Sequence, residues 1–241
     1  MHAKVRKVSG DDFAGRLRSI IEPLAPRFRD RARRDIESVL RLGAKSPADL
    51  LAIVRNNRVA PHFRIKVCWI LGRLGDKRAA PAMMVALTDN APRLRQAAAQ
   101  SLGELRSSRA LPLLVAALRA EPEVDVRTAI VSALGSLRDA RTFRPLVQLL
   151  NRKSEDPVVR GMAAEALADL PHSGAAAVLM TALSDPSAEV RFWAAFGLGQ
   201  LGAWHALPQL ELLASTDAAR LPRWGTVREE AIKAIERIRS L

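Results

Sequence analysis

Histidine and cysteine side chains are the first residues to examine for catalysis or metal binding, and their spacing favours neither. The chain has four histidines and one cysteine. His62, His172 and His205 lie far apart, each near a predicted turn, with no spacing that suits a single metal centre. Cys68 falls in an apolar column described below, as a packing residue does. Because the glycine patterns of nucleotide-binding loops are also missing, we expect a non-catalytic protein without a metal or a cofactor.

A repeated segment positions the remaining candidate residues. The segment 190–201 reads Val-Arg-Phe-Trp-Ala-Ala-Phe-Gly-Leu-Gly-Gln-Leu, and four near-copies of it lie upstream. Their arginines follow one another at intervals of 31 to 33 residues, at Arg64, Arg95, Arg127, Arg160 and Arg191. A fixed period of this length indicates a stack of similar helix pairs.

Prolines and turns divide each repeat into two predicted helices. The first helix begins near Pro81, Pro112, Pro145 or Pro208, and the second runs from the repeat arginine to the Leu-Gly-x-Leu end. The stretch 27–58 is interpreted as a diverged first repeat. We expect an N-terminal tail and a capping helix over 1–26, and the apolar face of this helix is formed by Phe13, Leu17, Ile20 and Ile21. Residues 27–241 are expected to form one continuous repeat domain, which ends in a capping helix from Thr226.

Alignment of the second helices on their arginines separates core columns from exposed ones. Three columns are apolar throughout and are predicted to form the core: Val67, Ala98, Ile130, Ala163, Ala194; Cys68, Ala99, Val131, Ala164, Ala195; and Leu71, Leu102, Leu134, Leu167, Leu198. Two further columns, four residues apart on one helix face, are mostly polar. They contain Gln100, Glu104, Glu165, Asp169 and Gln200.

Aromatic residues interrupt this polar face. Trp69 and Phe196 stand in the first polar column, and Phe192 and Trp193 lie beside Phe196. Since aromatic side chains dominate binding hot spots, one interpretation is an exposed patch that anchors a partner protein or peptide. The alternative is that neighbouring helices bury these rings.

Charge is concentrated in the first half of the chain. The net charge is +13, and residues 1–120 carry 24 Lys or Arg against 10 Asp or Glu, whereas residues 121–241 carry 14 against 15. A half-basic molecule suits nucleic acid or another polyanion, an acidic protein or an anionic membrane surface. The alternative is that the charge reflects a GC-rich genome, which prefers arginine to lysine, and a need for solubility. The candidate polyanion-binding residues are Arg27, Arg29, Arg31, Arg33, Arg34, Arg55 and Arg58.

Composition also sets expectations about the compartment. No apolar run is long enough for a membrane span, and the N-terminal residues lack the apolar core of a signal peptide. The single cysteine fits a reducing compartment. We expect a monomeric cytoplasmic protein.

The repeat pattern resembles HEAT repeats, specifically the short bacterial kind named after phycobilisome lyases. The resemblance covers roughly residues 27–241: a turn with an acid, Val-Arg, small residues, Leu-Gly-x-Leu, then Ala-x-Pro-x-Leu. It implies an all-α, right-handed α-solenoid of about six helix pairs with capping helices. It also implies that the polar face of the second helices lines the concave surface, and that the arginine column forms a buried ladder of charge-assisted hydrogen bonds. Three arginines have an acid six residues earlier, namely Asp89, Glu121 and Asp185.

The function implied by this resemblance is less specific, because the family contains adaptors, chromophore lyase subunits, iron-dependent hydroxylases and relatives of alkylpurine DNA glycosylases. The hydroxylases need His-Glu doublets, whereas the histidines here precede Ala3, Phe63, Ser173 and Ala206. A glycosylase-like site would use an acid with an aromatic residue, for which Asp169 and Trp193 are the candidates.

Three hypotheses follow. The first is a non-catalytic scaffold that binds a protein or peptide on its concave surface. The second is binding of nucleic acid or another polyanion through the basic half. The third is a chromophore-handling subunit like those of phycobilin lyases, which rests on the resemblance alone.

Overall fold

The computed structural model describes residues 10–24 and 26–241, and helices make up most of them. The predicted N-terminal tail falls mainly on residues 1–9, outside the described residues. The described chain forms two compact units, residues 1–110 and 111–241. The expected boundary after residue 26 is not tested by this division and stays a prediction.

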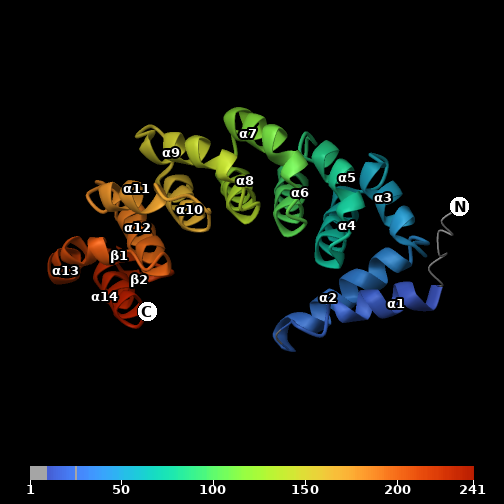
Figure 1. Ribbon diagram of the computed structural model, residues 1–241. Helices are drawn as coiled ribbons and strands as arrows, with labels where there is room; N and C mark the ends of the chain where they lie inside the picture. The colour runs from blue at the N-terminus through green and yellow to red at the C-terminus, as the bar shows by residue number, and fades with distance from the viewer. Residues whose placement is uncertain (1–9, 25) are drawn as a thin grey trace, which may run out of the picture. The chain divides into compact units, whose positions relative to one another are not determined.

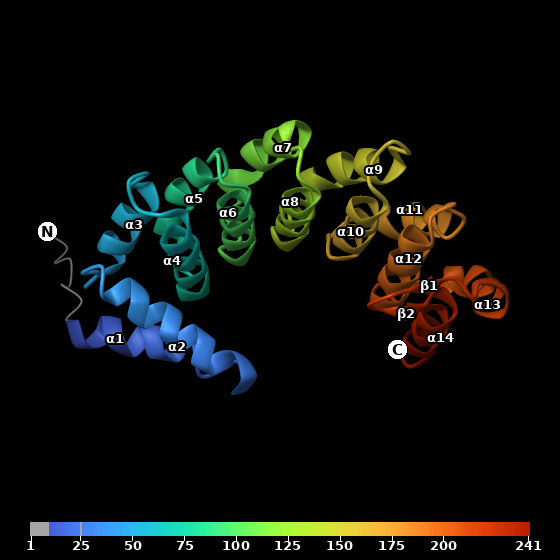
Figure 2. The same ribbon diagram turned by 180° about the vertical axis from the view of Figure 1, so that it is seen from behind.

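The described residues of the first unit contain helices α1 to α6 (Figure 1). Helices α3 and α5 form one layer, and α4 and α6 pack beside them as a second layer. Both α1 and α2 contact α4 (Figure 2). The helix bounds are α1 Gly10–Ser19, α2 Pro26–Leu40, α3 Pro47–Arg55, α4 Pro61–Leu74, α5 Ala80–Ala86 and α6 Pro92–Glu104, with 3-10 turns η1 Lys77–Ala79 and η2 Ser108–Ala110.

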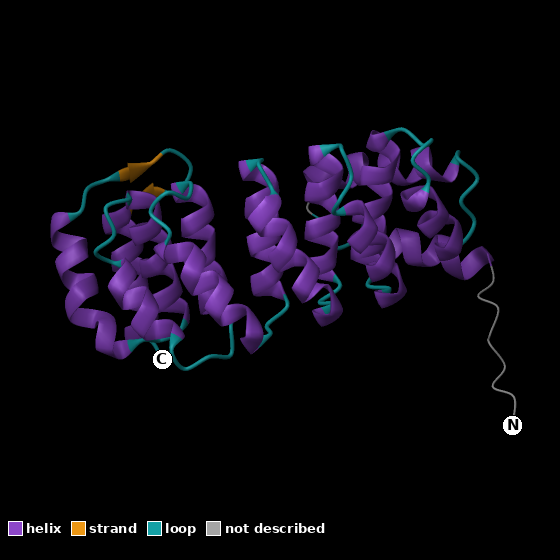
Figure 3. Ribbon diagram, turned by 90° about the horizontal axis from the view of Figure 1, so that it is seen from above, coloured by secondary structure: helices purple, strands orange, loops and turns teal. Residues whose placement is uncertain are grey.

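The second unit repeats the same pairing and ends in a short hairpin and a terminal helix. The two strands, orange in Figure 3, pair antiparallel with Arg220 opposite Thr226. Strand β1 lies against α12. The element bounds are α7 Leu111–Ala120, α8 Val124–Ser136, η3 Ala140–Thr142, α9 Phe143–Asn151, α10 Pro157–Ala168, α11 Ala175–Ala182, α12 Ala188–Gln200, η4 Trp204–Ala206, α13 Leu207–Thr216, β1 Arg220–Leu221, β2 Gly225–Thr226 and α14 Val227–Arg239.

Local sequence signals explain where these helices start and stop. Prolines occupy the first turn of several helices, where the missing N–H costs nothing. Thr226 and Glu229 form a reciprocal capping box at the start of α14. Gly75 ends α4 in the left-handed conformation at φ 68°. The predicted all-α solenoid of HEAT-like helix pairs is therefore confirmed. No helix in the described ranges has the length and apolar character needed to cross a bilayer.

The core follows the predicted columns. Every member of the three apolar columns is buried with essentially no exposed surface, and the N-terminal face formed by Phe13, Leu17, Ile20 and Ile21 is also buried. Cys68 belongs to this core, and its burial raises the pKa of the thiol to about 12. The thiol is therefore protonated and unreactive at neutral pH.

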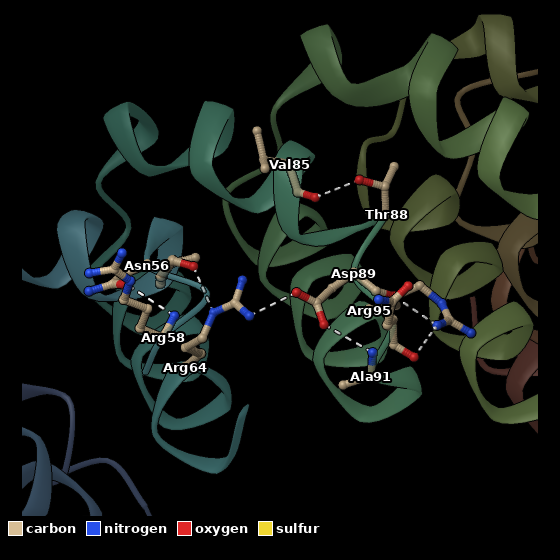
Figure 4. Close-up of polar contacts among 10 residues, drawn as sticks. Asn56, Arg58, Arg64, Val85, Thr88, Asp89, Ala91 and Arg95 are labelled. Atoms are coloured by element: carbon tan, nitrogen blue, oxygen red, sulfur yellow. Dashed lines mark hydrogen bonds and ion pairs between the residues drawn. The ribbon is translucent and has the colours of Figure 1, made fainter. Parts of the chain in front are cut away.

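The arginine column links successive repeats within each unit. Arg64 donates from Nε to the carbonyl oxygen of Val54 at 2.9 Å, and from Nη1 to Oδ2 of Asp89 in the next repeat at 2.8 Å (Figure 4). In the second unit, Arg127 pairs with Glu155, Arg160 with Asp185, and Arg191 with Asp217. Each of these arginines thus ties the backbone of its own repeat to a carboxylate of the following one, and we call this set the arginine ladder.

The direction of the ladder differs from the simplest interpretation of the sequence. Asp89 and Asp185, each six residues before an arginine, offer that arginine a backbone carbonyl oxygen. Arg95 donates to the carbonyl oxygen of Asp89 at 2.9 Å (Figure 4), and Arg191 donates to that of Asp185 at 2.8 Å. The carboxylates of Asp89 and Asp185 bind the arginine of the preceding repeat. Each of these aspartates therefore contacts two arginines, one through its carboxylate and one through its backbone carbonyl oxygen.

Asp185 shows how the ladder stabilises an ionised carboxylate at a buried position. Burial by itself would raise the pKa of this carboxyl, but hydrogen bonds from Arg160, Lys153 and the Ser187 backbone N–H outweigh that effect and lower it. The carboxylate is therefore ionised at neutral pH, and folding is favoured above the ordinary aspartate pKa of about 3.9.

Two of the predicted partner-binding aromatics belong to the core, so for them the alternative interpretation, burial by neighbouring helices, is correct and a role as exposed anchors is not. Phe192 is 4% exposed and Trp193 is 6% exposed. Gly161 of α10 makes room for the indole, because a Cβ there would lie 2.6 Å from Cδ1 of Trp193. Trp224, in the loop between β1 and β2, packs against the same indole with ring centroids 5.2 Å apart. The hairpin that covers Trp193 could not be recognised from the repeat pattern.

We expect Asp185→Ala to lower the free energy of unfolding by about 3–5 kcal/mol, because it leaves the Arg160 guanidinium buried without its carboxylate. The side chains of Arg160 and Asp185 are only 4% and 5% exposed. The control is Arg141→Ala, which removes an ion pair with Asp139. Because the Arg141 side chain is 67% exposed, this variant should lower the free energy of unfolding by only about 0–1 kcal/mol. Urea unfolding measures both, and equal small losses would contradict a structural role for the ladder.

We expect Phe192→Ala to destabilise the protein by about 3–5 kcal/mol, because it leaves a cavity beside Trp193. Trp204→Ala, at a tryptophan that is 65% exposed, should change the unfolding free energy by about 0.5 kcal/mol or less. Thermal or urea unfolding of the two variants distinguishes a core Phe192 from a surface anchor. If Phe192→Ala left the free energy of unfolding unchanged, the ring would not be part of the core.

Candidate functional site

A groove of about 590 Å³ lies on the first unit, between α2, α4 and α6. Its apolar side chains are Leu24, Phe28, Ile65 and Trp69, and its cationic side chains are Arg31, Lys66 and Arg93. Gln96, Gln100 and Glu104 add polar groups along α6. Grooves of this size and mixed lining are typical of small-molecule sites.

Helical spacing brings these residues to one place. Phe28, Arg31, Ala32 and Asp35 follow the i, i+3, i+4, i+7 pattern that aligns side chains on one face of α2. On α4, Ile65 and Trp69 are four residues apart, as are Gln100 and Glu104 on α6. The predicted polar columns therefore supply one wall, and α2 supplies the other.

The cations of the groove differ in how firmly they are held. Lys66 Nζ lies 3.1 Å from Oδ1 of Asp35 and donates to the hydroxyl of Ser38 at 3.1 Å. Arg31 lies 4.0 Å from the same aspartate. Arg93 has no carboxylate partner within the described ranges. An anionic ligand would thus find one unpaired cation and two that share a single carboxylate.

Glu104 is a carboxylate in an unusual position at the end of this wall. A Cβ on Gly72 would lie 2.4 Å from its Oε2 atom, so the carboxylate rests against the bare backbone of α4. Although Glu104 as a residue is exposed, burial of its carboxyl group raises the pKa, and the charge of Arg73 opposes that effect. Glu104 therefore binds a proton more readily than an ordinary glutamate.

The structure brings together only part of the predicted partner-binding set. Trp69, Gln100 and Glu104 line the groove of the first unit. The other members belong to the second unit. Glu165 lies on α10 and Asp169 at its end, and Phe196 and Gln200 lie on α12. Phe192 and Trp193, also on α12, are buried. Glu165 has a raised pKa, through burial and then through the neighbouring charge of Asp169.

Phe196 is half-buried in an aromatic cluster that the sequence predicted incompletely. Its ring lies 5.5 Å from that of Trp193 and carries the Arg237 guanidinium at 5.2 Å. Trp224, which the sequence analysis missed, is 52% exposed and completes the cluster. The signal that could have identified it is a tryptophan within the extra residues that lengthen the last repeat.

The seven candidate polyanion-binding arginines are all exposed: Arg27, Arg29, Arg31, Arg33, Arg34, Arg55 and Arg58. They are spread over several faces of α2, the end of α3 and the turn that follows it, rather than gathered into one patch. Arg29 is already engaged, since it donates to the carbonyl oxygens of Leu24 and Glu22 at 2.8 and 2.9 Å. Arg31 is the member of this set that also lines the groove.

Potential metal-binding side chains do not cluster in the described part of the chain. Among the residues that the structure describes, no three His, Cys, Asp or Glu side chains gather in a way that could hold an ion. His172 instead stacks on Phe143 with ring centroids 3.5 Å apart and accepts a hydrogen bond from the Gly174 N–H at Nδ1. Its ring is a structural part of the turn after α10.

Comparisons with known proteins agree with the repeat architecture. The bilin biosynthesis protein PecE of Mastigocladus laminosus is 35% identical over 102 residues, which is 39% of this chain and 38% of that protein. The chain thus matches well under half the length of this relative. Deoxyhypusine hydroxylase of Candida glabrata is 28% identical over 176 residues, 60% of this chain and 55% of that protein.

Among solved structures, the complex of CpcE and CpcF of phycocyanin lyase from Nostoc sp. PCC7120 contains a similar chain. It has a TM-score of 0.50 at 20% identity and covers 100% of this chain and 97% of that chain. This likeness concerns the fold.

Family models match most of the chain. The model for the PBS lyase HEAT-like repeat matches residues 126–152. The model for HEAT repeats matches residues 47–135 and 143–236. Since these two stretches include most of the chain and follow the helix pairs described above, the protein belongs to the HEAT-repeat family, with repeats of the PBS lyase type.

Proposed function

We propose that the protein is a ligand-handling subunit related to bilin lyases, which holds an open-chain tetrapyrrole or a ligand of the same chemistry in the groove around Trp69. The observation that carries this proposal is the combination of an aromatic and apolar groove with three cationic side chains in one unit. A bilin is a flat conjugated molecule with two carboxylate arms, so it needs both kinds of contact.

Each part of the groove has a role toward such a ligand. The faces of Trp69 and Phe28 offer π surfaces against which a flat pyrrole system can pack. Arg93 and Lys66 can pair with the carboxylate arms, and Arg93 has no carboxylate to give up first. Glu104 and Gln100 can accept hydrogen bonds from pyrrole N–H groups. The groove volume falls within the usual range for small-molecule sites of about 300–1,000 Å³.

The similarity to PecE supports this choice of ligand over others of similar size. That protein carries bilin biosynthesis in its name, and part of the present chain matches the PBS lyase HEAT-like repeat. The role proposed is binding and presentation of the ligand, because the groove contains no side chain with the environment of a nucleophile. Reaction chemistry would be supplied by a partner or by the ligand itself.

We expect the protein to bind biliverdin with a change in visible absorbance, and Trp69→Ala to weaken binding about tenfold or more, because the stacking surface is lost. Arg93→Ala should weaken binding by a smaller factor and make it less dependent on salt. Trp204→Ala is the matched control, since it removes an exposed tryptophan from the second unit. Absence of any absorbance change, or equal binding by the Trp69 and Trp204 variants, would overturn the proposal.

We propose as a second candidate function that the protein is a scaffold that binds a partner protein through the second unit. The half-exposed Trp224 beside Phe196 and Arg237 is the specific feature in its favour, because tryptophan and arginine are enriched in binding hot spots. We call Phe196, Trp224 and Arg237 the aromatic patch. It replaces the set that included Phe192 and Trp193, which are buried.

We expect the wild-type protein to capture a specific partner from the native organism and Trp224→Ala to lose it, since an exposed aromatic anchor would be removed. Arg239→Ala, at an exposed cation paired with Glu211 on the surface of the same unit, should retain the partner. Quantitative mass spectrometry of the captured proteins gives the comparison. The same captured proteins with wild type and Trp224→Ala would place the partner surface elsewhere.

A further inference from the structure

A second cleft on the first unit is lined by cations and is not part of the groove. It lies between η1 with the start of α5 on one side and the turn that follows α6 on the other, and has a volume of about 460 Å³. Its charged residues are Lys77, Arg78, Arg106 and Arg109, and Pro81 and Met84 form an apolar wall. No carboxylate lines it. We call this site the basic cleft.

In the described part of the chain, three of the four cations have no carboxylate partner. Arg78 is paired with Asp76 at 2.7 Å, an interaction that raises the pKa of the guanidinium and lowers that of the aspartate. Within the residues that the structure describes, Lys77, Arg106 and Arg109 form no ion pair. Unpaired like charges repel one another across a small cleft, and a bound anion would remove that repulsion.

Arg106 has a backbone conformation that favours glycine. Its φ is 47°, and its N–H donates to the carbonyl oxygen of Gly103 at 3.0 Å. The equivalent residue one repeat earlier is Gly75, with φ 68° and the same bond to Gly72. A non-glycine residue in this left-handed region costs conformational energy, so Arg106 lowers stability relative to glycine at the same position while it adds a cation to the cleft.

The surrounding charge favours an anion at this unit. Residues 1–110 contain 23 Lys or Arg against 10 Asp or Glu, whereas residues 111–241 contain 15 of each. The whole excess of +13 therefore belongs to the first unit. Such a field raises the local concentration of anions and speeds their association.

We propose that the basic cleft binds the phosphate groups of a nucleotide, either free or as part of a nucleic-acid strand. The guanidinium groups of Arg106 and Arg109 offer paired donors that match phosphate oxygens, and Lys77 adds a mobile point charge. The apolar wall of Pro81 and Met84 gives the ribose or base a surface to pack on. Ligand binding here is independent of the groove around Trp69.

The test measures binding of two probes, ATP and a short single-stranded oligonucleotide, to the full chain at about 50 mM salt. Arg106→Gly is the decisive variant, since it removes a cation and relieves the left-handed strain. We expect it to weaken binding about tenfold and to reduce the salt dependence, while the melting temperature stays the same or rises. Arg109→Ala should weaken binding to a similar extent.

Arg138→Gly is the matched control. Arg138 has the same backbone conformation, with φ 49°, but belongs to the second unit and does not line the basic cleft. This variant also removes the hydrogen bond from Arg138 Nε to the carbonyl oxygen of Asp169 at 3.3 Å, and it should bind both probes as the wild type does. Comparable affinity for ATP and the oligonucleotide would identify a free nucleotide as the ligand, and affinity for the oligonucleotide alone would identify a strand.

Two outcomes would overturn the proposal. One is that neither probe binds at low salt. The other is that Arg106→Gly and Arg109→Ala bind as the wild type does, while Arg27→Ala with Arg34→Ala on α2 abolishes binding. That second result would place the polyanion site among the arginines of α2.

Discussion

The rest of this structure depends on the arginine ladder. An α-helical repeat of this length cannot hide its apolar face alone, so each repeat must lie in a fixed register on the next. The ladder sets that register with directional bonds: one arginine binds a backbone carbonyl of its own repeat and a carboxylate of the following repeat, as Arg64 does with Val54 and Asp89. A buried charge without its partner is costly, so other registers are disfavoured.

Because the ladder and the leucine columns hold the repeats, the remaining positions of the second helices are free to vary. This freedom explains why the first unit can carry Trp69 and Gln100 in the same column where the second unit carries Glu165 and Phe196. The two proposed ligand sites, the groove and the basic cleft, both lie in the first unit. That unit also contains all of the net charge, which suits anionic ligands, while the second unit is neutral and offers the aromatic patch.

The sequence predicted the repeat architecture and the core well, because periodicity reports which side chains share a helix face. Leu71 and its equivalents are buried as expected, and the arginines have the structural role that the HEAT resemblance implied. Periodicity could not reveal contacts made by segments outside the repeat. Trp193 is buried because Gly161 leaves space and the hairpin brings Trp224 over it, and α2 forms a wall of the groove through Phe28 and Arg31. The basic cleft was missed for a different reason: Lys77 and Arg106 come from turns of two successive repeats, and helix periodicity does not report which turn residues lie close together.

The most direct test of the ladder is a double-mutant cycle on Arg64 and Asp89, with Arg64→Met, Asp89→Leu and the double variant compared by urea unfolding. If the ladder fixes the register of successive repeats, the double variant will be less destabilised than the sum of the two single variants, by about 1–3 kcal/mol. Strictly additive effects, within about 0.5 kcal/mol, would mean that the two side chains stabilise the protein independently. The ladder would then not be what joins one repeat to the next.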